Sequence, residues 1–396
     1  MTDLIVTVNA GSSSIRCAVF ELSKQTPKRL HQFHLRGLPD RCELIHHNLK
    51  SNKKQQRSVN IVQEGGLHQQ GLAAIIDAVE DVCGDAAQRV AGVAHRIVHG
   101  GEDFTAATEL HDDAIRRLQG LSCWAPSHQP ANLAAVDALR RHYPNARHIG
   151  CFDTMFHHHQ PWEARAFALP AALEQRGIRR YGFHGLSYAY IAQALAARGR
   201  RLTQAKAIVA HLGHGASMCA MDAGRSIATT MGLTPLDGLV MGARCGSLDP
   251  GVVLHLIEGE GMTPAAVRDM LYQESGMLGV SGLSSDMADL LASDQPQAAR
   301  AVALFVYYCQ RAVGSLAAAL GGVDVVVFTG GIGEHAADVR RAICEKLSWL
   351  GLHLDVAANA RGAETISTPD SSVAALVLAT DEEMVLAQEA ADVLKT

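Results

Sequence analysis

The amino-acid sequence predicts an α/β protein built from two related domains, on three observations. Short apolar segments, typical of buried strands, alternate along the chain with longer segments of helical periodicity. A strand, a glycine-containing turn and a second strand occur near the N-terminus and again about 200 residues later. The chain has 396 residues, which is too many for one ordinary hydrophobic core. This length allows two or three domains, and we expect two.

The first copy of the repeated segment is predicted to be a β-hairpin. Residues 4–8 (LIVTV) and 15–22 (IRCAVFEL) have the apolar character of strands. Residues 9–14 (NAGSSS) supply the polar, glycine-containing turn between them. We therefore expect two antiparallel strands in this part of the chain.

The second copy, residues 207–220 (AIVAHLGHGASMCA), has the same strand, turn and strand. Identities in so short a window can arise by chance, but the shared order of elements favours a duplicated domain. Placing the second copy on the first aligns His211 with Asn9, Gly213 with Gly11, Cys219 with Cys17 and Ala220 with Ala18.

The rest of the chain continues the alternation of an α/β fold. Helices are expected over residues 129–142 and 187–198, and strands over 89–98 and 147–152. Residues 323–334 (VDVVVFTGGIGE) are predicted to be a strand that ends in a glycine-rich loop, with a helix following at 336–347. Only residues 24–64, which are polar and basic, are expected to be loop-like or variable.

The composition excludes several classes of protein. Apolar residues make up 48% and charged residues 19%, a globular balance, and the net charge of -5 provides no basic footprint for nucleic acid. The nine cysteines contain no C-x-x-C pair, which argues against a disulfide framework and a zinc ribbon. No secretory signal is evident at the N-terminus, and no apolar run reaches the roughly 18 residues of a membrane span. We therefore expect a cytoplasmic protein with small-molecule ligands and no membrane partner.

Four segments combine glycine with hydroxyl or charged residues: 9–14, 211–215, 241–246 and 329–334. Glycine lets backbone N–H groups approach an anion closely, and such turns can hold phosphate. None of the four is a Walker loop, and each alone is more often a tight turn than a phosphate site. Arg96 is a further candidate, because it is expected at a strand end and its guanidinium can fork onto two phosphoryl oxygens.

Several acidic and histidine residues are candidate metal ligands. Asp153, Asp249, Asp286 and residues 381–383 are candidates, since Mg²⁺ in phosphoryl transfer needs only one or two carboxylates beside phosphate and water. Most such residues are helix caps, and 381–383 would suit the start of a helix near Met384. The run 157–159 (HHH) is expected to be a solvated loop and not a metal site.

Taken in order, the segments resemble the acetate kinase family across essentially the whole chain. The resemblance implies the duplicated actin, sugar kinase and Hsp70-like (ribonuclease H-like) fold, in which two α/β domains flank a cleft. The segments that carry it are VNAGSSSIR (8–16), HRIVHGGE (95–102), APSHQPANL (125–133), CFDTMFH (151–157), RRYGFHG (179–185), HLGHGAS (211–217), TTMGLTPLDGLVMGARCG (229–246), SGMLGVSGLSSDM (275–287) and FTGGIGE (328–334).

The resemblance also implies domain boundaries and an assembly. The N-terminal α/β domain would span residues 1–152 and be completed by a C-terminal helix at about 385–396. Residues 153–384 would form the C-terminal domain, which binds nucleotide and forms a homodimer.

Site residues follow from the resemblance at the matching positions. Asn9 and Glu382 would hold Mg²⁺. The catalytic residues would be Arg96, Asp153, His184 and Arg244. The acyl group would contact Arg96, Val98, Ser127, Phe183 and Pro235. ATP or ADP and its phosphates would contact Ser12, Ser14, Arg16, His128, His211, Gly213, His214, Gly215, Asp286, Gly330, Gly331 and Gly333.

The implied reaction is Mg²⁺-dependent phosphoryl transfer from ATP to acetate. Two arginines, a histidine and Mg²⁺ would bring two anions together, and an ionised carboxylate needs no general base, so direct in-line transfer without a phosphoenzyme is expected.

The sequence departs from the family pattern at six positions: Arg16 replaces lysine, Ser127 replaces leucine, Ala288 replaces arginine, and His214, His335 and Asp381 replace asparagine. The Ser127 change leaves a propionate or other short-chain carboxylate kinase as an alternative. The changes at 214 and 288 leave a catalytically impaired binding protein as another. The preferred phosphoryl donor is open.

Overall fold

The computed structural model describes residues 3–11, 14–23, 26–37, 42–59, 67–84 and 86–396. The chain divides into two compact units, and each is described by itself. Unit 1 comprises residues 1–155 and 381–396, and unit 2 comprises residues 156–380. The chain passes between the units at 155/156 and at 380/381, and both positions differ by a few residues from the expected boundaries. Asp153 belongs to unit 1 because its backbone N–H continues the strand pairing, donating to the Ile97 carbonyl at 3.0 Å.

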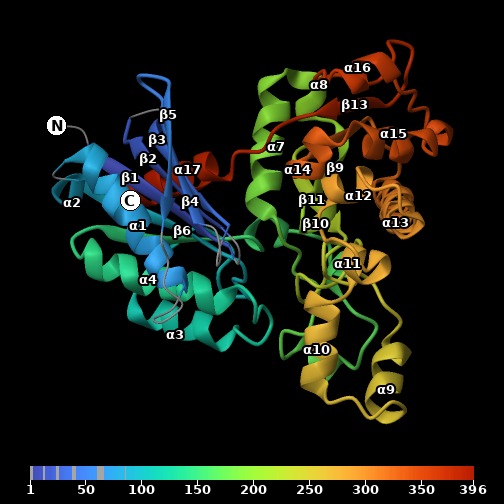
Figure 1. Cartoon of the computed structure of the whole chain (residues 1–396), viewed down its shortest axis with the longest axis horizontal. Helices are drawn as coiled ribbons and strands as arrows, with labels where there is room; N and C mark the ends of the chain where they lie inside the picture. The colour runs from blue at the N-terminus through green and yellow to red at the C-terminus, as the bar shows by residue number, and fades with distance from the viewer. Residues whose placement is uncertain (1–2, 12–13, 24–25, 38–41, 60–66, 85) are drawn as a thin grey trace. The chain divides into compact units, whose positions relative to one another are not determined.

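Unit 1 contains a sheet of eight strands in the order β5-β4-β3-β2-β1-β6-β8-β7 (Figure 1). β1 pairs antiparallel with β2 and parallel with β6, and β6 pairs parallel with β8. The predicted hairpin is therefore confirmed. The strands are β1 Leu4–Ala10, β2 Ser14–Glu21, β3 Lys28–Arg36, β4 Cys42–Asn48, β5 Lys53–Val59, β6 Val90–Ile97, β7 Thr108–Glu109 and β8 Arg147–Phe152.

The expectation of a loop-like segment at 24–64 is wrong, because β3, β4 and β5 lie there. These strands extend the sheet outward from β2, and β5 forms its edge. Only a few of their side chains, such as Phe33, Leu35 and Leu44, are buried in the core. The side chains of β5 are exposed along almost its whole length. An edge ribbon with so little burial lacks the apolar pattern by which strands are recognised.

Helices cover both faces of the unit 1 sheet. The β1 residues Leu4, Val6 and Val8 share an apolar core with α1 and α4. Because side chains alternate along a strand, Asn9 points to the opposite face, against which α17 packs. This alternation brings Asn9 to the N-terminus of α17. The helices are α1 Leu67–Cys83, α2 Ala86–Arg89, α3 Asp112–Gly120, α4 Gln129–His142 and α17 Glu382–Lys395.

Unit 2 repeats the central part of this arrangement. Its sheet has the order β11-β10-β9-β12-β13, with the same strand directions as β3-β2-β1-β6-β8. The predicted duplication is confirmed in the order and direction of the strands. The strands are β9 Lys206–Leu212, β10 Ala216–Asp222, β11 Arg225–Thr229, β12 Val325–Thr329 and β13 Ala374–Val377.

The two hairpins differ by one residue in their turns. Ala10 pairs with Ile15 in unit 1, whereas Leu212 pairs with Ala216 in unit 2. The second turn is therefore one residue shorter. The sequence alignment holds for the first strand of each hairpin, but the second strands are offset by one position in their pairing.

The unit 2 sheet is covered by α7 on one side and by α13 on the other (Figure 1). The expected glycine-rich loop at 330–335 is instead a short helix, α14, and the following helix is α15. The helices are α5 Trp162–Arg165, α6 Ala171–Glu174, α7 Gly185–Ala197, α8 Arg200–Thr203, α9 Pro250–Glu258, α10 Pro264–Gln273, α11 Gly276–Ser281, α12 Met287–Leu291, α13 Pro296–Leu320, α14 Gly330–His335, α15 Ala337–Glu345 and α16 Val356–Ala360, with 3-10 turns at Met155–His157 and Ser348–Leu350.

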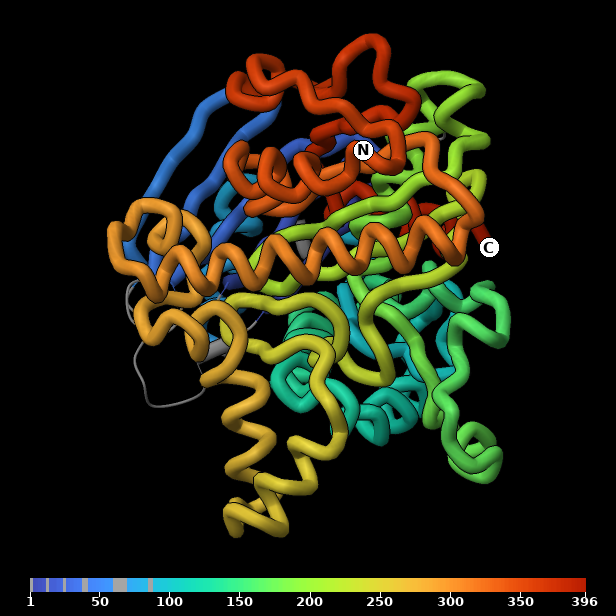
Figure 2. The backbone as a smooth tube through the Cα atoms, turned by 90° about the vertical axis from the view of Figure 1, so that its right-hand side faces the viewer, coloured from blue at the N-terminus to red at the C-terminus, as the bar shows by residue number. Residues whose placement is uncertain are grey.

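Helix α13 is long and apolar enough to cross a membrane by length and composition alone. Figure 2 shows it as one continuous helix across unit 2. It packs against β9, β10 and β11 and buries residues such as Phe305, Cys309 and Val313. Core helices of soluble proteins have the same length and composition, so this helix is weak evidence for a membrane span.

Candidate active site

Arg96 is the centre of a polar cluster in unit 1. It lies next to the last residue of β6, and its guanidinium makes four hydrogen bonds. Nε and Nη2 donate to the two carboxylate oxygens of Asp153 at 2.9 and 2.7 Å. Nη1 donates to Glu382 Oε2 at 3.0 Å and to Asn9 Oδ1 at 3.2 Å, and Asn9 Nδ2 donates to Glu382 Oε2 at 2.9 Å. The cluster thus joins four residues that the sequence predicted separately.

The local structure explains why these four side chains meet. β1, β6 and β8 are parallel, so their carboxyl ends, which carry Asn9, Arg96 and Asp153, lie at one edge of the sheet. Glu382 is the first residue of α17, which packs on the Asn9 face. Asp381 caps this helix by accepting from the Met384 N–H at 3.1 Å.

The charge on Arg96 is firmly held. Burial works against a guanidinium charge, but the attraction of Asp153 and of Glu382 outweighs it, so the pKa of Arg96 lies above its usual range. The carboxyl of the neighbouring residue, Glu383, is harder to ionise than usual. Burial and the adjacent Glu382 charge raise the pKa of its carboxyl, and its Oε1 has no hydrogen-bond partner among the described residues.

The oxygen atoms around Arg96 fit a hard divalent cation. Asn9, Asp153 and Glu382 offer amide and carboxylate oxygens, which Mg²⁺ prefers. Within the described ranges, no three or more His, Cys, Asp or Glu side chains gather as a metal site. An ion here would therefore take most of its ligands from phosphate and water. It would also share its protein oxygens with Arg96.

Two side chains of α4, which the sequence analysis missed, hold the ends of β1 and β6. Asn132 accepts from the Val98 N–H at 3.1 Å and donates to the Ala10 carbonyl at 2.8 Å. Gln129 accepts from the His99 N–H at 3.0 Å and donates to the His99 carbonyl at 2.9 Å. Their spacing of three residues on a predicted helix was the signal that could have found them, because such residues share a face.

In unit 2, His184 precedes α7 in a conformation rare for histidine. Its φ of 59° and ψ of 23° lie in the left-handed region. The buried ring places Nδ1 2.8 Å from Ser217 Oγ, which also lies 2.5 Å from the Tyr188 hydroxyl. The ring stacks on His211 with centroids 4.4 Å apart, and His211 Nδ1 lies 2.8 Å from Ser187 Oγ. Strain of this kind persists only where the surroundings enforce it, often at functional sites.

Arg244 is a half-buried cation whose charge no carboxylate neutralises in the described part of the chain. Its Nη1 donates a hydrogen bond to the Pro235 carbonyl at 2.6 Å. Burial lowers the pKa of Arg244 to about 10, so the guanidinium is still charged at neutral pH. A Cβ on Gly215 would lie 2.7 Å from Arg244 Nη2 and 3.4 Å from His184 Nε2. Both groups therefore face the same glycine, and together they form a candidate anion site.

The turn that carries Arg244 is fixed by the start of α11. The Ser275 N–H donates to the Ala243 carbonyl at 3.0 Å, and the Met277 N–H donates to the Met241 carbonyl at 2.9 Å. Between them Gly276 has a φ of 61°, and a Cβ there would overlap the Met241 carbonyl oxygen. Only glycine fits this position, which makes the placement of Arg244 rigid.

A pocket of about 380 Å³ lies next to this site in unit 2. It collects Gly213, His214, Asp286 and Gly331, which were predicted to contact the nucleotide. Ala288 and His335, two of the positions that depart from the family pattern, also line it. Burial and the Arg244 charge lower the pKa of His214, which favours its neutral form.

Comparison with known proteins gives the family. The acetokinase family matches residues 4–388. The chain belongs to this family. It is 48% identical to an acetate kinase of Rhodopseudomonas palustris (strain TIE-1) over 391 residues, 98% of each chain. Among solved structures, a propionate kinase from Francisella tularensis subsp. tularensis (31% identity, 98% of each chain, TM-score 0.87) and the acetate kinase of Porphyromonas gingivalis (33% identity, 99% of this chain and all of the other, TM-score 0.84) are similar.

The predicted fold class is therefore confirmed for this acetokinase-family chain. Predicted site residues fall in both units. The predicted acyl contacts Val98 and Ser127 belong to unit 1, and Phe183 and Pro235 belong to unit 2. Val98 and Phe183 are buried, whereas Ser127 is exposed in the turn before α4.

The predicted phosphate contacts near the first hairpin are only partly described. Ser12 lies outside the described residues. Ser14 begins β2, and its carbonyl accepts from the Gly11 N–H at 2.9 Å. Arg16 is exposed on β2, where its charge attracts Glu383. His128 lies immediately before α4.

The predicted glycines of α14 have different surroundings. Gly331 is open, with no heavy atom within 4 Å of a Cβ placed there, whereas Gly333 packs against Phe328 and the β9 backbone. Gly330 has a φ of 78°, and its N–H donates to Glu334 Oε1 at 3.0 Å. Gly331 is therefore the one of the three that lines the described pocket.

The expectation that residues 157–159 form a solvated loop is wrong for His157, whose ring is buried. Its Nε2 lies 3.0 Å from the Phe183 carbonyl, and its Nδ1 lies 2.8 Å from Ser226 Oγ. Burial lowers the pKa of His157 to about 4. The residue therefore holds the chain immediately before His184.

Proposed function

We propose that this protein is an acetate kinase, which reversibly transfers a phosphoryl group from ATP to acetate in the presence of Mg²⁺ and gives acetyl phosphate and ADP. The observation that carries the proposal is Arg244, a half-buried guanidinium without a carboxylate partner among the described residues, which faces Gly215 together with His184 Nε2. Such a site favours a phosphoryl group over a neutral ligand. Acetate kinase is also the name of the relative that is 48% identical.

The phosphoryl group needs hydrogen-bond donors as its charge moves to new oxygens. Arg244 supplies fixed donors. The Tyr188 hydroxyl can donate to Ser217, and Ser217 can donate to His184 Nδ1, which leaves Nε2 of the neutral imidazole as a donor. The αL backbone of His184 and the rigid turn of Arg244 keep these donors in place, so little reorganisation is needed during transfer.

Arg96 is proposed to bind the carboxylate substrate. Its bidentate pair with Asp153 fixes the plane of the guanidinium, and the side chain retains 19% exposure. Asn9 and Glu382 are the residues proposed to hold Mg²⁺, which when bound neutralises phosphate charge. An acetate carboxylate is ionised at neutral pH and attacks phosphorus directly, so no residue serves as a base or as a phosphorylated intermediate.

The pocket lined by Gly213, His214 and Gly331 is proposed to take the nucleotide of the donor. Its volume of about 380 Å³ lies within the size range of small-molecule sites. Backbone at Gly213 and Gly331 allows close approach of the ligand. His214 and His335, which line this pocket, replace asparagines of the family pattern. The preference of this chain for ATP over other phosphoryl donors is therefore to be measured directly.

The test is a donor and acceptor screen of the purified protein, with acyl phosphate trapped as hydroxamate. Product from ATP, Mg²⁺ and acetate is expected. The proposal fails if no donor and acceptor pair gives acyl phosphate. That result would favour a catalytically impaired binding protein instead. The presence of Arg96 and Arg244 argues against this alternative.

A propionate kinase is the second candidate, and Ser127 favours it. Serine at this predicted acyl contact is smaller than leucine and leaves room for a longer chain. A propionate kinase is also among the similar solved structures. If kcat/KM for propionate or butyrate is well above that for acetate, the longer acid and not acetate is the preferred substrate.

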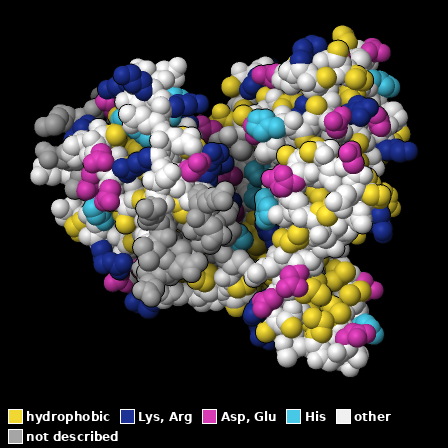
Figure 3. Space-filling model, in the orientation of Figure 1, with side chains coloured by type: hydrophobic (Ala, Val, Ile, Leu, Met, Phe, Trp, Pro, Cys, Tyr) yellow, Lys and Arg dark blue, Asp and Glu magenta, His cyan; other side chains and the backbone are white. Residues whose placement is uncertain are grey.

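We further propose a cytoplasmic homodimer formed through unit 2. All the large hydrophobic side chains exposed in the described ranges, except Leu49, belong to unit 2. Two of them, Val252 and Leu254, lie on α9. Figure 3 shows hydrophobic side chains gathered over α9 and α10. Light scattering on the purified protein is expected to give twice the chain mass of 42.2 kDa, and a monomer would refute the assembly.

A further inference from the structure

A pair of histidines outside the candidate active site lies on the outer strands of unit 1. His31 on β3 and His46 on β4 place Nδ1 and Nε2 3.1 Å apart, with ring centroids separated by 5.3 Å. Both side chains are half-buried. Neither the proposed reaction nor the apolar core of unit 1 uses them.

The separation of the two nitrogens matches the bite of a metal chelate. Imidazole nitrogens bind Zn²⁺ at about 2.0–2.1 Å, so two of them at angles between square and tetrahedral lie about 2.9–3.4 Å apart. The observed distance falls within this range without any movement of the strands. Two neutral imidazoles at this distance share one hydrogen, which a metal ion can replace.

The His46 ring is held in position by its neighbours. Phe33 stacks on it with centroids 4.7 Å apart and an interplanar angle of 10°. The Gln55 side chain, opposite on β5, hydrogen-bonds the same imidazole. Since Nε2 faces His31, Nδ1 is left for the Gln55 oxygen. A ligating histidine commonly donates its second N–H to an oxygen in this way.

Both imidazoles are ready to act as ligands at neutral pH. Burial lowers the pKa of His31 and of His46, so both are neutral, which is the form that binds metal. The Lys50 charge lowers the pKa of His31 further and opposes a bound cation. Lys50 is exposed, so solvent screens this repulsion.

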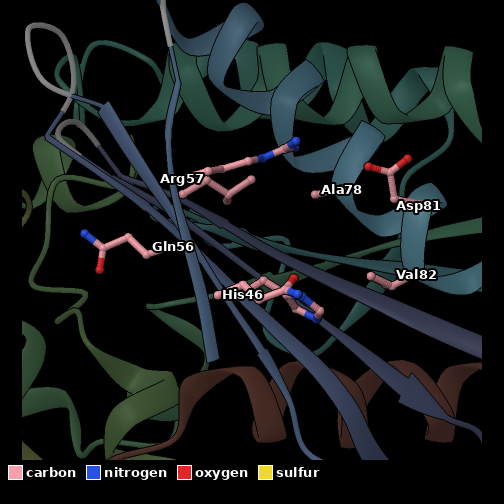
Figure 4. Close-up of a pocket in the computed structure, with 8 residues that line it drawn as sticks. His46, Gln56, Arg57, Ala78, Asp81 and Val82 are labelled. Atoms are coloured by element: carbon pink, nitrogen blue, oxygen red, sulfur yellow. The ribbon is translucent and has the colours of Figure 1, made fainter. Parts of the chain in front are cut away.

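Space for further ligands lies beside His46. A pocket of about 390 Å³ is lined by His46 and, among others, Gln55 and Arg57 of β5 and Ala78, Asp81 and Val82 of α1. Figure 4 shows Arg57 reaching from β5 toward α1, the helix that carries Ala78, Asp81 and Val82. Within the described ranges no third His, Cys, Asp or Glu joins the pair. Water from this pocket would therefore complete the coordination.

We propose that His31 and His46 bind one late first-row divalent transition-metal ion, of the Zn²⁺, Ni²⁺ and Cu²⁺ class. Imidazole selects such ions over Mg²⁺. The ion takes the lone pair of His46 Nε2 and that of His31 Nδ1, and the hydrogen on His31 Nδ1 moves through solvent to His31 Nε2. Both rings stay neutral, so no net proton is released. The bound ion links β3 to β4.

The test is calorimetric titration of the untagged protein with Zn²⁺ in excess Mg²⁺ at neutral pH. A site in the micromolar range is expected, as two protein ligands give moderate affinity. His31→Ala and His46→Ala should each weaken it by about tenfold or more. His47→Ala is the matched control, because His47 is adjacent on β4 but bonds Asn52 Oδ1 at 3.0 Å; its affinity should be unchanged.

A second measurement separates metal binding from folding. Without Zn²⁺, all variants are expected to melt within a few degrees of the parent protein, since these side chains are half-buried. Zn²⁺ should raise the melting temperature of the parent and of His47→Ala only. Equal Zn²⁺ affinity in the parent, His31→Ala and His46→Ala would overturn the proposal, as would the absence of micromolar binding in the parent.

Discussion

Protonation of His157 is expected to destabilise unit 2 in mild acid. The ring is 1% exposed, and burial lowers its pKa from 6.5 to about 4. In the folded protein Nε2 must donate to the Phe183 carbonyl, so Nδ1 accepts from Ser226, whose oxygen accepts from Gln160 Nε2 at 2.8 Å. A protonated ring would carry a charge into this buried network, where the described hydrogen-bond partners of the ring include no carboxylate.

The sign and the size of the effect follow from the two pKa values. Because the folded pKa lies below the unfolded one, the unfolded chain takes up the proton first, and stability is lost as pH falls from about 6.5 toward 4. The shift corresponds to about 3 kcal/mol in full, of which about 2 kcal/mol is lost between pH 7 and pH 5.

Urea unfolding at pH 7 and pH 5 measures this loss. Trp124→Phe leaves Trp162 and Trp349, both in unit 2, as fluorescent reporters. His157→Gln in that background keeps a donor for Phe183 but removes the titration. The parent should lose about 2 kcal/mol more than His157→Gln over this pH range. Equal losses in the two proteins would refute the assignment of His157 as a buried neutral group.

Three further predictions concern the candidate active site. Arg244→Ala should lower kcat by about 10²-fold or more with an unchanged melting temperature, because it removes charge stabilisation of the phosphoryl group; near-normal turnover would contradict its role. Gly215→Ala places a Cβ 2.7 Å from Arg244 Nη2 and should lower kcat by about tenfold or more, because it displaces the guanidinium. An unchanged kcat would show that the Arg244 side chain can move aside without loss of activity. Arg96→Ala should destabilise unit 1 by about 3 kcal/mol, because it removes the guanidinium that neutralises the buried Asp153 carboxylate. Adding Asp153→Asn should restore much of this stability in thermal melts, and an equally unstable double variant would refute the electrostatic cause.

The elements with strong local patterns could be predicted from the sequence. β1 and β2 flank a polar glycine turn, and α4 has helical periodicity, so both were predicted close to their observed bounds. β3 to β5 were missed because an exposed ribbon at the edge of a sheet has no apolar pattern. The α14 helix was missed because its glycines are typical of loops.

The candidate site was predicted as single residues and not as contacts. Asn9 and Glu382 are 373 positions apart, and no spacing rule links them. Their contact depends on strand alternation in β1 and on the packing of α17, which are tertiary features. Burial of His157 was missed for the same reason, since one of three adjacent histidines turns inward only when the surrounding core is known.

The placement of α17 sets the order in which the protein can mature on the ribosome. Glu382 begins α17, more than 220 residues after Asp153, while Asn9, Arg96 and Asp153 lie within residues 1–155. An emerging chain therefore exposes Arg96 and Asp153 without the carboxylate that bridges Arg96 to Asn9 until α17 has been synthesised. A polypeptide truncated before α17 would lack both that bridge and one cover of its sheet, so unfinished chains are expected to be inactive.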